Sequence, residues 1–384
     1  MRVTNSILVS NLMRNLNSNL TRMDGLNNQL ATGRKYAHIS DDPSALIYSQ
    51  SARNRLARLS HYQRTVETAQ DWLVQAEAGA TELQSVLVNA YEALVDAGMD
   101  GKTPGDKQNI AKVISQLREH FVDTLNSTFG DKYVYGGYNT PGDPDGDNKE
   151  IKSFTVRDGK LHFNGFDLSV FDGMPAALLE VNLQGLTPTE VENKLDEIFT
   201  SLGFADADAF FADFNSGRGP GDELDMSKLL MMHRLKSDVL TFDVGPGISM
   251  PVTINGIDLI LYTSTDEEGN PVTRNAFNVL TDLLEATLND ASASELTKII
   301  PPLQNGQNHL LTKMSEIGGR VRRLELLEAR YEQDAINYER MRSDAEDVDM
   351  AGVILNLKMA EAIYQAALSS GARIIQPTLM DFLR

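Results

Sequence analysis

Residues 8–30 read LVSNLMRNLNSNLTRMDGLNNQL, with a leucine or methionine at every third or fourth position. This spacing places the apolar side chains in one stripe along an α-helix. The other positions are mostly asparagine and serine, which compete with the helical backbone for hydrogen bonds. The segment therefore predicts a helix that is marginal by itself and needs a partner to cover its stripe.

Helical signals continue after this segment. Gly33 ends the first helix, and Asp42-Pro43 begins a second one as N-cap and first-turn proline. An apolar stripe then runs from Ser44 to Ala97, and a further helix is expected over residues 106–128. The first third of the chain is therefore predicted to be almost entirely helical.

Helices also dominate the C-terminal part. Residues 310–338 keep a four-and-three alternation of apolar residues, which is typical of a coiled-coil seam. Ser343-Asp344-Ala345-Glu346 has the capping-box pattern, so we expect the last helix to start there and to reach about Ala372. That helix carries apolar side chains around most of its circumference, so we expect it to pack against more than one neighbouring helix.

The middle of the chain has sequence signals of turns and short strands in place of long helical repeats. Asp158-Gly159, Asn164-Gly165 and Asp172-Gly173 follow one another closely and indicate hairpin turns, and Asn255-Gly256 indicates another. A short helix is expected over residues 189–202. The predicted fold is mainly α with a β-containing insert (α+β), in which both chain ends form long antiparallel helices.

Three domains are expected from these patterns. Residues 1–43 and 345–384 form a terminal helical domain, residues 44–130 and 273–344 a long-helix bundle, and residues 131–272 a β-rich outer insert. The insert is acidic: residues 131–225 hold 19 acidic and 7 basic side chains.

Composition excludes several classes of protein. The net charge of −19 repels phosphate backbones, so we expect no nucleic acid partner. No apolar run approaches the ~20 residues that span a bilayer, so no membrane partner is expected. The 384 residues include no cysteine, which removes disulfides, thiolate metal sites and cysteine nucleophiles. The asparagine-rich start has no apolar core of a cleaved signal peptide.

Candidate chemistry in the sequence is weak. The six histidines are scattered without metal-ligand spacing. Asp143 to Asp147 resembles the start of a calcium loop but lacks the later glycine and glutamate, so a solvated turn is favoured. The glycines of residues 217–221 lack the features of a phosphate loop and are read as a flexible turn. We expect no catalytic, cofactor-binding or metal-binding residue, and no enzyme.

Motifs near both ends resemble the flagellin superfamily, and more closely its hook–filament junction branch. They are Leu26 to Lys35, Ser40-Asp41-Asp42-Pro43, Asp347 to Ala351, the closing segment from Ala366 to Leu383, and the turn Tyr135-Gly136-Gly137.

The resemblance implies a structural subunit of the bacterial flagellum, exported through the flagellar type III apparatus. Its implied partners are copies of itself, hook-associated protein 1, flagellin or a distal adaptor, and an export chaperone. Flagellin itself is the alternative identity. Flagellins usually open with an Ile-Asn-x-Asn-type start and commonly end in a Leu-Leu run, whereas this chain has Arg2-Val3-Thr4-Asn5-Ser6 and Leu379-Met380-Asp381-Phe382-Leu383-Arg384 at these places.

The terminal stripes need burial that two helices alone cannot provide, and further copies of the chain could supply it. The expected assembly interface consists of Leu8, Leu12, Leu16, Met23, Leu30, Val348, Leu355, Met359, Ala362, Ala366 and Ile374.

Overall fold

The structure is a computed structural model that describes residues 5–36, 40–99, 101–137, 152–183, 185–216, 218–219, 222–237, 239–266 and 268–375. The chain divides into two compact units, each built from segments distant in sequence. Unit 1 comprises residues 1–61 and 329–384, and unit 2 comprises residues 62–328. The three-domain division expected from the sequence stays a prediction.

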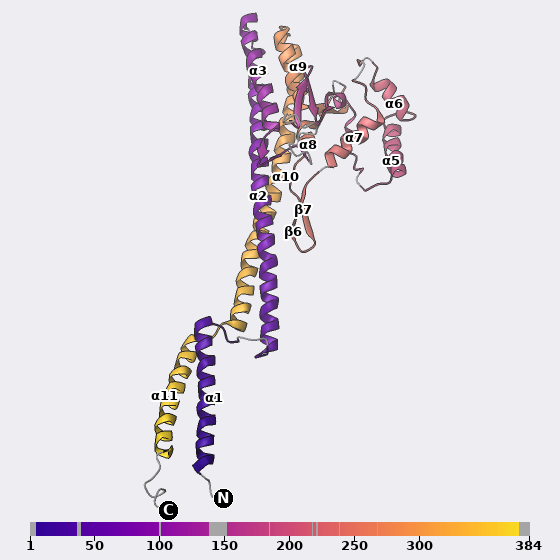
Figure 1. Cartoon of the computed structure of the whole chain (residues 1–384). Helices are drawn as coiled ribbons and strands as arrows, with labels where there is room; N and C mark the ends of the chain where they lie inside the picture. The colour runs from indigo at the N-terminus through magenta and orange to yellow at the C-terminus, as the bar shows by residue number, and fades with distance from the viewer. Residues whose placement is uncertain are drawn as a thin grey trace, which may run out of the picture. The chain divides into compact units, whose positions relative to one another are not determined.

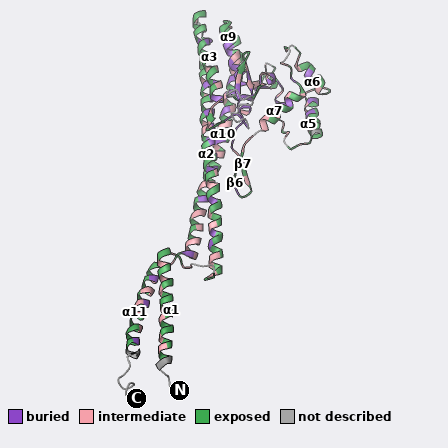
Figure 2. Cartoon of the chain, in the orientation of Figure 1, coloured by how far each residue is buried: buried purple, intermediate pink, exposed green. Residues whose placement is uncertain are grey.

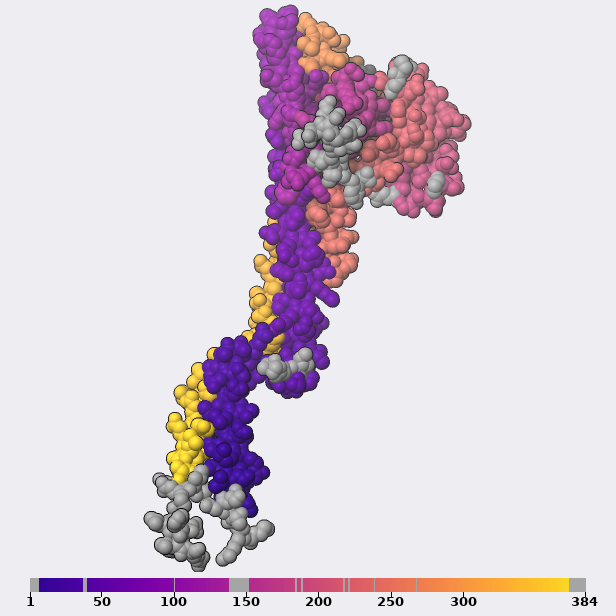
Figure 3. All heavy atoms as spheres, in the orientation of Figure 1, coloured from indigo at the N-terminus to yellow at the C-terminus, as the bar shows by residue number. Residues whose placement is uncertain are grey.

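Unit 1 is helical. Helix α1 (Asn5–Thr32) packs against α11 (Met350–Ile375), and Figure 3 shows the two side by side in indigo and yellow. The unit also holds the first part of α2 (Pro43–Ala97) and the last part of α10 (Ala293–Glu346). Both chain ends therefore contribute one long helix each to the same pair.

Unit 2 is centred on the remaining parts of α2 and α10 (Figure 1). Gln307 Nε2 of α10 donates to the carbonyl of Leu87 in α2 at 2.9 Å. Helix α3 (Pro104–Leu125) packs against α9 (Ala276–Leu288). The large apolar side chains buried in α10 recur every seven residues, which confirms one of the two rows of the predicted seam: Leu296, Leu303, Leu310, Ile317, Leu324 and Tyr331.

Small antiparallel sheets fill much of the insert. The described strands are β1 (Thr128–Phe129), β2 (Lys132–Tyr133), β3 (Phe154–Arg157), β4 (Lys160–Phe163), β5 (Phe166–Asp167), β6 (Thr241–Gly245), β7 (Ile248–Pro251), β8 (Leu261–Thr265) and β9 (Pro271–Asn275). They pair in sequence as β1-β2, β3-β4-β5, β6-β7 and β8-β9. Between them lie a 3₁₀-helix (Ser169–Phe171) and the helices α4 (Ala176–Glu180), α5 (Pro188–Ser201), α6 (Ala207–Phe214), α7 (Met226–Ser237) and α8 (Gly256–Ile260).

Two of the predicted hairpin turns are confirmed. Asp158-Gly159 joins β3 to β4 and Asn164-Gly165 joins β4 to β5, with Asp158 and Asn164 both at a φ of 51°. The left-handed conformation explains why these positions hold aspartate, asparagine and glycine.

The other two hairpin predictions are wrong. Asp172 ends the 3₁₀-helix, and the amide of Gly173 donates to the carbonyl of Thr273 at 2.8 Å. Asn255 is the N-cap of α8, and its side chain accepts from the amide of Ile257 at 3.0 Å. Asparagine is favoured at N-caps as well as in hairpin turns, which explains the second error.

Two buried tyrosines fasten the insert to the long helices. The hydroxyl of Tyr135 donates to the carbonyl of Ala76 in α2 at 2.6 Å, beside Gly79. The hydroxyl of Tyr262 donates to the carbonyl of Pro302 in α10 at 2.7 Å, beside Gly306. In both helices the missing glycine side chain leaves room for the aromatic ring.

The capping-box prediction at residues 343–346 is wrong. Helix α10 runs through these residues to Glu346, and α11 begins only at Met350. Its N-cap is Asp349, whose carboxylate accepts from the amide of Ala351 at 3.1 Å. The predicted turn from Asp143 to Asp147 lies outside the described residues, as do positions 217, 220 and 221 of the glycine-rich turn.

Candidate assembly surface

Helices α1 and α11 share a narrow seam. The half-buried positions of α1 recur at steps of three and four residues: Val9, Leu12, Leu16, Asn19, Met23, Leu26 and Leu30. On α11 one row of covered positions follows the same spacing, with Gly352, Asn356 and Glu361 half-buried beside it: Val353, Leu357, Ala360, Tyr364, Ala367 and Gly371. Because the two helices pack together, each turns this one row toward the other.

Two contacts fix the register of the seam. Asn19 Nδ2 donates to the carbonyl of Ala360 at 2.9 Å, which places a polar group inside an otherwise apolar row. Leu12 lies against Gly371, where a side chain on residue 371 would have no space. A lone polar pair in an apolar helix seam specifies one alignment over its alternatives.

The seam covers α1 only in part. Among its residues 7–32, none is fully buried, and Figure 2 shows much of this helix exposed. Large apolar side chains therefore remain in contact with solvent, with Met13 60% exposed. The exposed apolar residues of α1 are Ile7, Leu8, Met13 and Leu20.

Helix α11 presents a longer exposed apolar set away from the seam. Leu355 is 62% exposed and Met359 is 48% exposed. The full set is Met350, Ile354, Leu355, Met359, Ile363 and Leu368. Together with the exposed apolar residues of α1, we call these the outward face of unit 1. Large apolar side chains left exposed in such number indicate an interaction surface.

Nine of the eleven predicted interface residues fall into two groups. Leu12, Leu16, Met23 and Leu30 are half-buried and belong to the seam within the chain. Leu8, Leu355, Met359, Ala362 and Ala366 are exposed. Val348 lies half-buried in the break before α11, and the side chain of Ile374 lies outside the described residues.

Several members of the outward face were missing from the predicted interface. Met350, Ile354, Ile363 and Leu368 are exposed on α11, as are Ile7, Met13 and Leu20 on α1. The signal was the apolar character of α11 on more than one side. A single apolar stripe on each helix does not show which of its residues contact the other helix of the same chain and which stay exposed.

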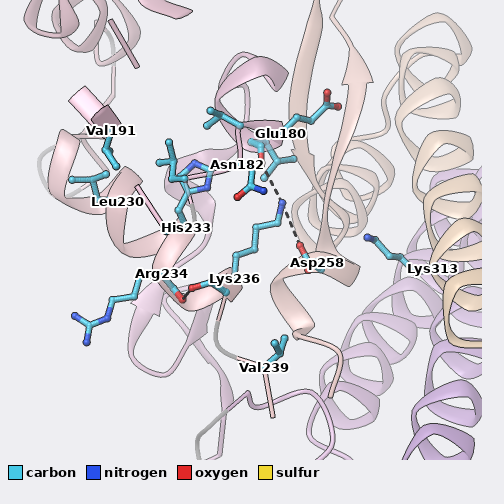
Figure 4. A pocket seen from close by; sticks show the side chains of 15 residues that line it. Glu180, Asn182, Val191, Leu230, His233, Arg234, Lys236, Val239, Asp258 and Lys313 are labelled. Carbon is cyan, nitrogen blue, oxygen red and sulfur yellow. Dashed lines mark hydrogen bonds and ion pairs between the residues drawn. The ribbon is translucent and has the colours of Figure 1, made fainter. Parts of the chain in front are cut away.

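Unit 2 contains a cavity of about 810 Å³ beside α7 (Figure 4). Two of its charged groups, Lys236 and Asp258, pair with each other. Lys236 Nζ lies 3.3 Å from Asp258 Oδ1 and donates to the carbonyl of Leu179 at 3.2 Å. His233 Nε2 donates to the carbonyl of Leu178 at 2.8 Å. These contacts tie α7 to α4 and α8.

Burial changes the titration of the cavity histidine. Desolvation lowers the pKa of His233 to about 4, although the hydrogen bond to Leu178 opposes the shift. The ring is therefore neutral near pH 7 and acts as a hydrogen-bond donor. The hydrogen bond from His233 to Leu178 holds α7 against α4.

Within the described ranges, no helix combines the length and apolar character needed to cross a bilayer. Nor do three or more histidine or acidic side chains of those ranges gather as metal ligands would.

Comparisons with known proteins agree with this geometry. Residues 3–140 match the family model of the bacterial flagellin N-terminal helical region. The chain is 21% identical over 368 residues to flagellar hook-associated protein 3 of Salmonella typhimurium, covering 96% of this chain and 95% of that protein. The hook-associated protein 3 of Escherichia coli gives the same identity and coverage.

Solved structures share the fold. A flagellar hook-associated protein of Vibrio parahaemolyticus is 13% identical, with a TM-score of 0.53, over 80% of this chain and all of its own. Hook-associated protein 3 of Legionella pneumophila is 10% identical, with a TM-score of 0.50, over 77% of this chain and 99% of its own. The predicted fold class is confirmed. Residues 3–140 thus match the bacterial flagellin N-terminal helical region, and the chain as a whole is similar to flagellar hook-associated protein 3.

Proposed function

We propose that this chain is a structural subunit of the bacterial flagellum that acts at the junction between hook and filament. The observation that carries the proposal is the outward face of unit 1, where Leu355 is 62% exposed on a helix already paired with α1. Its resemblance along 96% of the chain to hook-associated protein 3 supports the flagellar role.

Burial between subunits would drive assembly. Covering a leucine or methionine side chain completely contributes about 1.5–3 kcal/mol relative to leaving it exposed. The outward face holds ten such large apolar residues, six on α11 and four on α1. Because these side chains are already about half covered in the isolated chain, burying the rest would contribute about half of that value for each. The total is of the same order as the ~4–15 kcal/mol lost in freedom on association.

The proposed partners follow from the junction role. Copies of the same chain would cover the outward face, hook-associated protein 1 would bind on one side, and flagellin or a distal adaptor on the other. We also propose export through the flagellar type III apparatus without a cleaved signal peptide. Before export, a chaperone would cover the apolar C-terminal helix, and deletion of residues 345–384 should abolish its binding.

The proposed role is structural and involves no catalysis. The hydrogen bonds and the ion pair in the cavity of unit 2 agree with this proposal. Its lysine and aspartate are paired, and its histidine is held by a main-chain carbonyl. The proteins that this chain resembles are named flagellar hook-associated protein 3.

Flagellin, the filament subunit, is the alternative identity, because the N-terminal match is to the flagellin helical region. A deletion strain examined by electron microscopy separates the two roles. For a junction protein, we expect hooks without filaments while flagellin appears in the culture medium. If the filament polymer is missing because its own subunit is absent from both cells and medium, the chain is flagellin.

A further inference from the structure

The break between α10 and α11 has no stop signal in its own sequence. The two helices are separated by Asp347, Val348 and Asp349, and residues 343–351 contain neither glycine nor proline. Helices commonly end at a glycine or shortly before a proline. The amide of Asp347 still donates to the carbonyl of Ser343 at 2.8 Å, as it would in a continuing helix.

The stop comes from the segment that follows α1. The amide of Lys35 donates to the carbonyl of Glu346 at 2.7 Å, and Lys35 Nζ donates to the carbonyl of Asp344 at 2.8 Å. The amide of Val348 turns away from α10 and donates to the carbonyl of Gly33 at 3.0 Å. Carbonyls in the last turn of a helix lack partners within it. Lys35 thus caps α10 from a distant part of the sequence.

Helix α2 also contacts the C-terminal end of α10, through the side chain of Glu346. The Glu346 carboxylate accepts hydrogen bonds from the Ser49 hydroxyl and from the Arg53 guanidinium. Glu346 is only 8% exposed, so its charge depends on these two donors. Gln29 of α1 adds a hydrogen bond from Nε2 to the carbonyl of Lys35 at 2.8 Å. Helix α2 and the segment after α1 therefore both contact Glu346, and α1 is linked to it through Lys35.

We infer that Glu346 and Lys35 form a clasp that keeps α10 and α11 apart, and that removal of the Glu346 carboxylate lets α10 continue into α11. In the extended state, the amide of Val348 would leave Gly33 and bond Asp344 in helical geometry. The N-cap at Asp349 favours the separate state by about 1 kcal/mol, which is too little to hold the break alone. The clasp concerns the isolated chain and does not depend on assembly.

The segment after α1 (residues 33–36) and the break before α11 (residues 347–350) should therefore change conformation together. Closing the clasp orders the segment after α1 and the break before α11 together, because each supplies the other's hydrogen bonds. Opening it would free residues 33–36 while residues 347–350 exchange one set of hydrogen bonds for another. The direction in which α11 leaves α10 is then set by one carboxylate.

Hydrogen–deuterium exchange on the full-length chain tests this. The variant is Glu346→Ala, and the matched control is Glu339→Ala, which removes an exposed glutamate of α10 in the same unit. We expect at least tenfold faster exchange in residues 33–36 of the Glu346 variant, with residues 347–350 still protected, and no change in the control. Far-UV circular dichroism verifies folding, and Glu346→Gln replaces the alanine variant if that variant unfolds.

Two results overturn the inference. If residues 33–36 and 347–350 both exchange rapidly, the break frays and α10 does not extend. If neither segment changes, the carboxylate does not hold the clasp.

Discussion

Leu12 occupies the space that a side chain at position 371 would require: a Cβ built on Gly371 would lie 2.5 Å from Leu12 Cδ2. The contact joins the first helix of the chain to the last one near their free ends. Together with Asn19 and Ala360, it defines a single alignment of α1 on α11.

Replacing Gly371 by valine should loosen this pair. The branched side chain would overlap Leu12, and overpacking of this kind costs about 1–3 kcal/mol. We expect faster protease cleavage after Arg14 and Arg22 in the isolated chain. Gly319→Val on α10 is the control, because a Cβ there meets nothing within 4 Å. Equal cleavage of the two variants would show that the seam tolerates the larger residue.

Charges on the outward face should block assembly and leave the isolated chain intact. Leu355→Asp alters an exposed residue, so its unfolding free energy should change by no more than about 0.5 kcal/mol. In the flagellum, the same carboxylate would need to be buried against a neighbour, at a cost of several kcal/mol. Motility in soft agar and electron microscopy of the strain measure the effect.

Leu326→Asp serves as the matched control, because Leu326 is 66% exposed on α10 in unit 2. Normal filaments in the Leu355 variant would exclude this face from the interface.

Acid should weaken unit 2 through His233. Its folded pKa is about 4, below the ordinary value of 6.5, so the folded state binds fewer protons than the unfolded state between these values. Stability is therefore complete above about pH 6.5 and falls as the pH decreases toward 4, by at most about 3 kcal/mol. Urea unfolding at pH 7 and pH 4.5 measures the loss.

His233→Gln keeps a side-chain amide near Leu178 but does not titrate. Its unfolding free energy should depend less on pH than that of the wild type over this range. An unchanged pH dependence would mean that His233 is as easily protonated in the folded chain as in the unfolded one.

Tyr135 and Gly79 should be energetically coupled. Gly79→Ala places a Cβ against the Tyr135 hydroxyl, so we expect destabilisation although alanine favours helices. Tyr135→Phe loses the hydrogen bond to Ala76 and should cost about 1–2 kcal/mol. The double variant should be less destabilised than the sum, because the overlapping oxygen is absent. Additive losses in urea unfolding would contradict the close packing of Tyr135 against Gly79.

Much of the helical architecture followed from sequence periodicity. The apolar spacing after Asn5 and after Pro43 predicted α1 and α2 to within a few residues, because a long repeat averages out individual exceptions. Asp158-Gly159 and Asn164-Gly165 predicted their turns because both demand a left-handed backbone.

Features fixed by distant contacts could not be predicted in this way. Asn255-Gly256 suits a hairpin or a helix start equally, and the close approach of the Phe154 ring to Gly256 is visible only in the fold. Glu346 was assigned to a local capping box, whereas its partners Ser49 and Arg53 lie in α2. The leucines of α1 likewise do not reveal which of them α11 covers.

The central claim is that other copies of the chain cover the outward face of unit 1. Because the chain has no cysteine, Leu355→Cys introduces a single thiol whose reactivity with a maleimide can be measured. We predict rapid labelling of the isolated chain and at least tenfold slower labelling in purified hook–filament particles. Equal labelling rates in the two states would contradict the claim.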